Sequence, residues 1–212
     1  MKLIDISTDL MRAKRVPMEP EPRLQKLNRM DCGDACDTTA LYTSLHTGTH
    51  VNAASFIQEE EEEPPHISDL PLETFIGPVT VVSVPEGPVT GEVIENYLPR
   101  NAERIIIRGP FWEKDVTFFG GAAKDLADIG YKLIGFEGAA NNGDEDMSLY
   151  YQLMANGAVV LEGLDLSKVE RDGDFFLMAQ PLKLEGTEAA LCRAVLVEDQ
   201  LFWASRDSRL HL

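Results

Sequence analysis

The middle of the chain alternates short apolar runs with stretches of helical character, and this order constrains the fold more than any other feature. Residues 79–84 and 104–108 are apolar and rich in β-branched side chains, which is typical of buried strands. Strands are predicted at residues 3–7, 41–50, 79–84, 104–108, 131–136, 158–161, 175–181 and 193–197. Helices are predicted at residues 90–98, 121–129 and 148–156. Strands come first, β-α-β units follow and strands return, so we expect an α/β domain with a mixed sheet.

Length and composition predict a single domain over residues 1–212. A chain of 212 residues with 44% hydrophobic residues can bury a full core. Residues 59–63 form a run of five glutamates, which is expected to be a solvated loop. Residues 200–212 form a C-terminal tail, whose Phe202 and Trp203 would pack either against a neighbouring subunit or back on their own core.

The net charge and the N-terminal sequence limit the kinds of binding partner and the cellular compartment that we expect. Nineteen basic and 36 acidic residues give a net charge of −17, which opposes binding to nucleic acid and to anionic membranes. No apolar run reaches the roughly 20 residues that span a bilayer. An aspartate at position 5 interrupts what would be a signal peptide, and three cysteines suit a reducing compartment. We therefore expect a cytoplasmic protein that binds neither nucleic acid nor membranes.

Two cysteines precede a pair of histidines at a spacing that resembles a zinc site. Cys32 and Cys36, followed by His46 and His50, form a Cys-x3-Cys and His-x3-His set. The nine residues between the two pairs are fewer than the roughly twelve of a zinc finger, and acidic residues surround the cysteines. Two readings stay open: a structural zinc site with four ligands, or two free thiols.

The segment from His46 to Phe56 carries the densest chemical information. Thr47, Gly48 and Thr49 separate the two histidines, and these residue types disfavour a helix. A strand or a turn opened by Gly48 could still direct both imidazoles to one point. Because side chains alternate along a strand, His50 and Asn52 are expected on one face.

This segment resembles the metal-binding motif of the cyclase family, which includes the bacterial kynurenine formamidases. That motif reads H-x-G-T-H-x-D-x-P-x-H, and here its first half is intact from His46 to His50. Further similar segments are Phe-Ile-Gly-Pro at 75–78, Leu-Ile-Gly at 133–135 and Leu-Glu-Gly-Leu at 161–164. The resemblance spans nearly the whole chain. It implies a swivelling β/β/α fold and a homodimer or homotetramer.

The resemblance also implies a set of metal ligands, of which this chain keeps a part. His46, His50 and Glu162 match family ligands. Asn52 replaces the motif aspartate, Phe56 the acid/base histidine, and Tyr150 the histidine twelve positions before the glutamate. Phe56, Tyr150 and Glu137, which follows the Leu-Ile-Gly segment, are expected to line the pocket.

These replacements predict altered chemistry. In the family, bound metal activates water and polarises the carbonyl of an amide, formamide or cyclic amide. Asn52 lacks the charge of a bridging carboxylate, Phe56 cannot transfer a proton, and Tyr150 binds metal only as phenolate. His46, His50 and Glu162, with Asn52 as a weak further candidate, could hold one zinc or manganese ion, and a metal-free site is the other reading. Two functions therefore stay open: a hydrolase with impaired or altered activity, and a non-catalytic protein that binds a small molecule or a partner in the old active site.

Overall fold

The computed structural model describes residues 1–13, 19–57, 64–109, 118, 121–138 and 147–198 of the chain. Its core is a mixed sheet of nine strands in the order β1-β11-β9-β5-β6-β7-β8-β4-β10. Strands β5, β6, β7 and β8 run parallel to one another, and the other pairings in this sheet are antiparallel. The predicted α/β class with a mixed sheet is confirmed.

The strands and helices have the following bounds. The first five strands are β1 Lys2–Asp5, β2 Arg23–Asn28, β3 Thr38–Tyr42, β4 His50–Asn52 and β5 Ile76–Ser83. The others are β6 Arg104–Arg108, β7 Leu133–Glu137, β8 Val159–Leu164, β9 Gly173–Met178, β10 Ala189–Leu191 and β11 Val195–Glu198. The helices are α1 Gly91–Tyr97, α2 Ala122–Asp128 and α3 Ser148–Ala155. None of the helices described here is long and apolar enough to cross a membrane.

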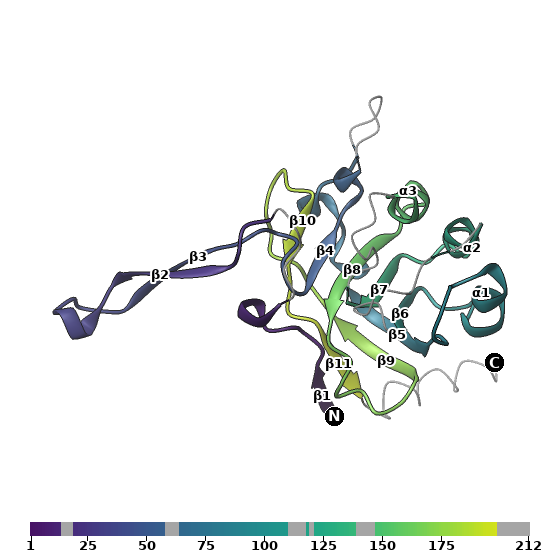
Figure 1. Ribbon diagram of the computed structural model, residues 1–212, viewed down its shortest axis with the longest axis horizontal. Coiled ribbons are helices and arrows are strands. Elements are labelled where there is room, and N and C mark those ends of the chain that lie inside the picture. Colours follow the sequence, from purple (N-terminus) through teal and green to yellow (C-terminus); the bar gives the residue numbers. More distant parts are fainter. Residues whose placement is uncertain (14–18, 58–63, 110–117, 119–120, 139–146, 199–212) are drawn as a thin grey trace, which may run out of the picture.

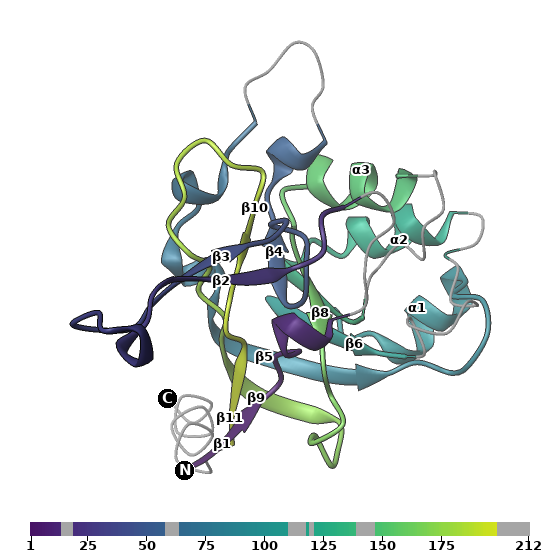
Figure 2. The same ribbon diagram turned by 60° about the vertical axis from the view of Figure 1, so that its left-hand side comes forward.

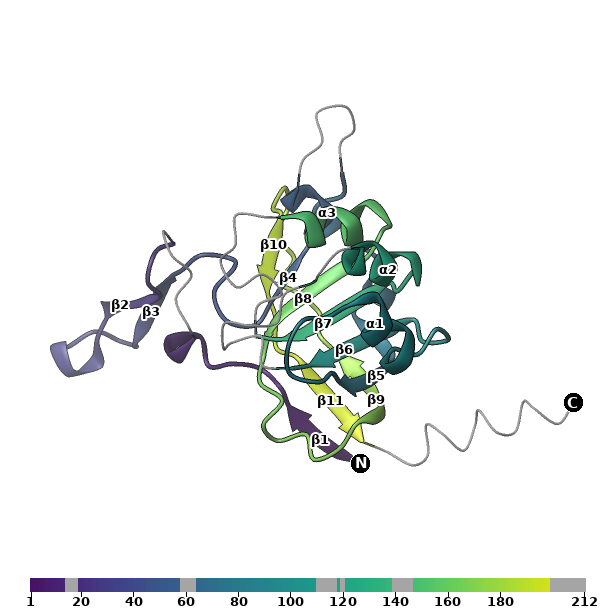
Figure 3. The ribbon, with the colours of Figure 1, turned by 45° about the vertical axis from the view of Figure 1, so that its right-hand side comes forward.

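The three helices pack on one side of the parallel strands, which divides the core into two parts (Figures 1 and 3). On the helix side, Ile94 of α1, Leu126 of α2 and Leu153 of α3 are buried in one apolar cluster. On the opposite side, strand residues such as Val51 and Leu161 form a second cluster. Strand β8 contributes to both clusters, Val160 to the first and Leu161 to the second, and all six of its residues are buried, as expected for an interior strand.

The sheet curls so that its first strand approaches β8. The amide of Ile6 donates to the carbonyl of Ala194 at 3.0 Å, and the carbonyl of Ile6 accepts from the amide of Asp165 at 2.9 Å. Ser7 also forms a bridge with Leu164. The N-terminal segment therefore connects two parts of the sheet that are far apart in strand order.

Strands β2 and β3 form a separate two-stranded sheet, which projects as a hairpin away from the nine-stranded sheet (Figures 1, 2 and 3). The strands are joined through a short 3₁₀ turn, Met30–Cys32, and the left-handed Gly33. The other 3₁₀ turns are Leu10–Arg12, Ala54–Phe56, Ile67–Asp69 and Leu72–Thr74.

Most predicted elements are confirmed within a few residues, and β6 has the predicted bounds. Thr90 caps α1, since its hydroxyl accepts from the amide of Val93 at 3.4 Å. Gly130 and Gly157 follow α2 and α3 with positive φ values of 81° and 80°, which is typical of helix C-termini. The glutamate run at 59–63 and the tail at 200–212 lie outside the described residues.

One predicted strand is wrong. Residues 41–50 were expected to run as a single strand into the histidine segment, but β3 ends at Tyr42 and β4 begins at His50. Between them the chain turns, with Gly48 at a φ of 70°. This left-handed conformation, which glycine adopts without steric cost, lets the chain turn between the two strands.

A substitution at Gly163 in β8 can test how tightly the turn at Gly48 is packed. Its φ is 70°, and a Cβ atom there would clash with the backbone carbonyl of Gly48. We expect Gly163→Ala to lower the free energy of unfolding by about 3 kcal/mol or more, through backbone strain and overlap. Gly157→Ala is the control, because its φ is similarly positive but nothing lies within 4 Å of the added Cβ. Gly157→Ala should lower the free energy of unfolding by only about 1 kcal/mol. Equal losses for the two variants in urea denaturation would contradict the close packing of Gly163 against Gly48.

Candidate active site

The candidate site is built around the carboxylate of Glu162, which lies in the interior strand β8. Strand β4 pairs antiparallel with β8, and this register places His50 directly opposite Glu162. Glu162 is only 3% exposed. Because a buried carboxylate has lost its hydration, it must be compensated by hydrogen bonds or positive charge.

Two hydrogen-bond donors reach this carboxylate from different elements. The hydroxyl of Tyr150, in α3, donates to Oε1 at 2.7 Å. The side-chain amide of Asn52, in β4, donates to Oε2 at 2.7 Å. Both Tyr150 and Asn52 are buried. Asn52 and Tyr150, which the sequence resemblance places at metal-ligand positions, therefore each donate to one of the carboxylate oxygens.

The imidazole of His50 completes this cluster. Its Nδ1 lies 3.0 Å from the carbonyl of Gly48, and a carbonyl only accepts, so Nδ1 carries a proton. Its Nε2 then faces Oε2 of Glu162 at 3.5 Å. A second proton on Nε2, or a cation between the two atoms, makes this approach favourable. The predicted common face of His50 and Asn52 is confirmed, since both side chains reach Glu162.

His46 lies next to this cluster but makes its polar contact elsewhere. Its Nε2 lies 3.2 Å from Oε1 of Glu188, which precedes β10. Its ring packs against those of His50 and Phe56, with centroid distances of 5.3 and 4.8 Å. Phe56 in turn contacts Tyr150 at 5.5 Å. Glu188 was missed by sequence reasoning, because nothing in the local pattern marks an acidic loop residue as the partner of a histidine 142 positions away.

The donor set can be compared with what a metal centre requires. Two ligand atoms of a tetrahedral zinc ion are about 3.4 Å apart, which is close to the 3.5 Å between His50 and Glu162. However, the carboxylate oxygens also accept from Tyr150 and Asn52, and His46 is paired with Glu188. In the part of the chain that the structure describes, no group of three or more His, Cys, Asp or Glu side chains could hold a metal ion. The residues as arranged do not fit a two-metal centre.

One buried polar atom in the site has no hydrogen-bond partner among the described residues. It is Oδ1 of Asn52, in a residue with no exposed surface. Since buried acceptors are nearly always satisfied, this atom is the place where a water, a ligand or a cation would bind within the cluster.

The structure places the other candidates outside the Glu162 cluster. Glu137, a predicted pocket residue, ends β7 and is half-buried, and burial raises the pKa of its carboxyl while Arg108 opposes the shift. Among the described residues, the groups that act on its carboxyl lie outside the Glu162 cluster. Cys32 and Cys36 are exposed near the end of the β2–β3 hairpin, which projects from the sheet that carries His50 (Figure 1). The free-thiol reading of these cysteines is favoured over the four-ligand zinc site.

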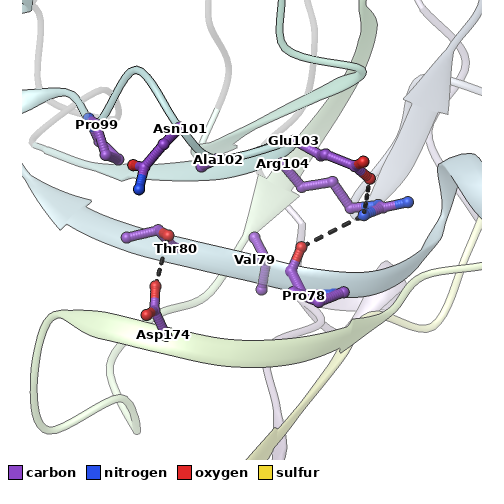
Figure 4. Close-up of a pocket in the computed structure, with 9 residues that line it drawn as sticks. All are labelled: Pro78, Val79, Thr80, Pro99, Asn101, Ala102, Glu103, Arg104 and Asp174. Carbon is purple, nitrogen blue, oxygen red and sulfur yellow. Dashed lines mark hydrogen bonds and ion pairs between the residues drawn. The ribbon is translucent and has the colours of Figure 1, made fainter. Parts of the chain in front are cut away.

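A cavity of about 430 Å³ lies away from these residues, between β5, β9 and the segment that leads into β6 (Figure 4). Its polar groups are largely paired with one another. Thr80 donates to Asp174 at 2.6 Å, and the guanidinium of Arg104 donates to Pro78 and Glu103. It contains no histidine or cysteine, so it does not compete with the Glu162 cluster as a reaction centre.

The fold and the cluster together define an α/β protein with a histidine–carboxylate centre between β4, β8 and α3. The Cyclase family model, described as "Putative cyclase", matches residues 4–111. A kynurenine formamidase of Salinibacter ruber is 31% identical over 210 residues, covering 92% of this chain and 97% of that protein. One from Delftia acidovorans is 31% identical over 176 residues, covering 77% and 82%. The chain belongs to the cyclase family.

Solved structures support the same fold. A predicted metal-dependent hydrolase from Bacillus stearothermophilus aligns with a TM-score of 0.73 at 22% identity, covering 92% of this chain and 97% of that one. An isatin hydrolase bound to the product analogue thioisatinate aligns with a TM-score of 0.76 at 18% identity, covering 93% of each chain. At these identities the likeness concerns the fold alone.

The hydrogen bond from Tyr150 to Glu162 leads to a prediction about the free energy of unfolding. Tyr150→Phe should lower the free energy of unfolding by about 1–3 kcal/mol, because a donor to a buried charged acceptor is lost. Tyr151→Phe, one position further along α3 and 44% exposed, should change it by less than about 0.5 kcal/mol. Urea denaturation of both variants checks this. Equal effects would show that the Tyr150 hydroxyl contributes nothing specific.

If Cys32 and Cys36 are free thiols, we can also predict how fast they react with a thiol reagent. Cys32 and Cys36 are exposed, whereas burial raises the pKa of the Cys192 thiol to about 12. Because the thiolate is the reactive form, two thiols per chain should react rapidly with Ellman's reagent at pH 8 and the third only after denaturation. Cys192→Ala should leave the rapid phase unchanged. Protection of Cys32 and Cys36 that a zinc chelator relieves would instead favour the zinc reading.

Proposed function

We propose that this protein is a divergent relative of the metal-dependent amide and formamide hydrolases, in which the two-metal reaction is impaired or altered. It binds at most one divalent metal, zinc or manganese. The proposal depends on one observation, namely that both oxygens of the Glu162 carboxylate accept hydrogen bonds from the protein, from Tyr150 and Asn52 at 2.7 Å each.

The same substitutions remove three chemical groups that such a reaction uses. Asn52 offers a neutral amide where a bridging carboxylate would hold two cations. Tyr150 presents a hydroxyl whose proton is engaged by Glu162, so it is not available as an anionic ligand. Phe56 packs between His46 and Tyr150 and cannot act as an acid or base. Metal binding, the bridging group and proton transfer are affected together, which supports an impaired or altered reaction.

A second candidate function is the binding of a small aromatic molecule without turnover. The rings of His46, Phe56 and Tyr150 form a row with centroid distances of 4.8 and 5.5 Å. Rows of this kind offer faces and edges for stacking a flat ligand. The unpartnered Oδ1 of Asn52 adds a buried acceptor that could orient it.

Metal content and turnover test the proposal. Protein purified without a histidine tag should contain at most one zinc or manganese ion per chain. Hydrolysis of N-formylkynurenine should be at least about 1,000-fold slower than with the Salinibacter ruber relative measured alongside, because the acid/base group and a metal site are missing. Two tightly bound ions per chain and turnover at the rate of the relative would contradict the proposal. Thermal stabilisation by N-formylkynurenine without turnover would favour the binding function.

A variant that restores the family residues provides the matched control. The triple substitution Asn52→Asp, Phe56→His and Tyr150→His should increase the metal content toward two ions per chain and raise the hydrolysis rate above that of the wild type. Adding His50→Ala to the triple variant should abolish both gains. A triple variant that folds but gains neither property would show that other differences in the chain block the reaction.

A further inference from the structure

We propose that the cavity between β5, β9 and the segment before β6 binds a small organic cation, namely a primary ammonium group on a short hydrocarbon chain. This cavity, called the β5–β9 cavity below, has a volume of about 430 Å³ (Figure 4). Ligand pockets commonly range from about 300 to 1,000 Å³. None of its lining residues belongs to the Glu162 cluster, so the proposal is independent of the proposed function.

The β5–β9 cavity contains a carboxylate that forms no ion pair with any described residue of the chain, that of Asp174 in β9. Asp174 accepts a hydrogen bond from the hydroxyl of Thr80 at 2.6 Å, and Thr80 lies directly opposite it in β5. The other carboxylate in the lining, Glu103, already lies 3.3 Å from both Arg104 and Lys132. Asp174 is therefore the anionic group of the cavity whose charge no described side chain balances.

The guanidinium of Arg104, the cationic group of the cavity wall, has little capacity left for a ligand. Its side chain is only 4% exposed. Its Nε donates to the carbonyl of Thr74 at 2.9 Å, and its Nη2 donates to the carbonyl of Glu73. Its Nη1 donates to the carbonyl of Pro78 at 3.4 Å and to Glu103 at 3.3 Å. Because a guanidinium has about five N–H donors, few remain, and an anionic ligand would find no strong partner here.

Hydrogen-bond acceptors, in contrast, are in excess on the facing walls of the cavity. Thr80 donates its hydroxyl proton to Oδ1 of Asp174, which leaves Oδ2 of Asp174 and the lone pairs of Thr80 as acceptors. Asn101 faces these two groups from the segment before β6 (Figure 4), and its side-chain carbonyl is a further acceptor. An ammonium group carries N–H donors together with a positive charge. It therefore matches both the free acceptors and the unbalanced charge of Asp174.

Apolar residues form much of the remaining lining of the cavity. Pro78 lies in β5, and Pro99 and Ala102 lie on the facing segment. Such walls remove the methylene groups of a hydrocarbon chain from water, which favours binding. A bare calcium ion needs about six to eight oxygen ligands close together and gains nothing from apolar walls. The combination of a carboxylate with apolar walls thus favours an organic cation over a metal ion.

The overall charge of the protein favours the same class of ligand. The chain carries a net charge of −17, and a field of this sign attracts cations to the surface and repels anions. A neutral alcohol of the same size would gain nothing from this field or from the charge of Asp174. The charge of the ligand is therefore the property to vary in a test.

Titration of the full chain with butylamine, followed by two-dimensional ¹H–¹⁵N NMR spectra at pH 7, tests the proposal. Butylamine is protonated at this pH, like the side chain of lysine, and 1-butanol is its neutral counterpart of nearly the same shape. Butylamine should bind saturably and at least about 10-fold more tightly than 1-butanol, because only the ammonium forms charge-assisted hydrogen bonds. The backbone amide signals of Thr80, Asn101 and Asp174 should shift on binding.

Three variants locate the effect. Asp174→Asn removes the charge but keeps an oxygen that can accept from Thr80, so it should bind butylamine about 10-fold less tightly. Asn101→Asp adds a carboxylate to the facing wall and should tighten binding about 3-fold or more. Glu185→Gln is the control, because it removes one charge at an exposed position before β10, outside the cavity lining. This control should bind butylamine like the wild type.

Four outcomes would overturn the proposal, and the spectrum of each variant shows at the same time whether that variant is folded. Unchanged spectra would mean that the cavity does not bind an ammonium. Equal affinity for butylamine and 1-butanol would mean that it selects hydrocarbon and not charge. Equal weakening by Asp174→Asn and Glu185→Gln would mean that butylamine responds only to the net charge. Larger shifts of the same three signals with calcium chloride at equal concentration would indicate a metal site instead.

Discussion

The structure of the site depends on how one buried carboxylate is compensated. Glu162 lies in a fully buried interior strand of the sheet, where water has little access to its charge. Removing a carboxylate from water is costly unless donors or cations replace the lost hydration. Here Tyr150 and Asn52 supply donors, and His50 supplies a ring nitrogen at 3.5 Å. Three elements, α3, β4 and β8, are thereby held together at one point.

This compensation also explains why Asn52 and Tyr150 act as a pair. A carboxylate at this position that binds no cation needs at least two donors, and an amide and a phenol hydroxyl supply them. If only one of the two positions carried a donor, one oxygen of Glu162 would have to be satisfied in another way. The amide and the hydroxyl thus satisfy one carboxylate oxygen each, while the fold around them is that of the family.

Backbone packing, rather than side-chain chemistry, brings the histidine segment to this carboxylate. Gly48 turns the chain before β4, and its carbonyl accepts from His50 while lying against Gly163 of β8. The hydroxyl of Thr49 donates to the carbonyl of Gly163 at 2.6 Å. Glycine at both positions permits an approach that a Cβ atom would prevent. The Thr-Gly-Thr sequence between the histidines therefore serves the geometry of the site as well as its local turn.

The sequence by itself determined the order of the parallel strands and helices, the family, and the common face of His50 and Asn52, because periodicity and local motifs act over a few residues. Only the tertiary structure decided that His46 pairs with Glu188, that Tyr150 and Asn52 both donate to Glu162, and that residues 23–42 project as an arm. The short strand β10 and the break between β3 and β4 were likewise missed. These features depend on contacts between residues far apart in the chain, whose free energies no local pattern records.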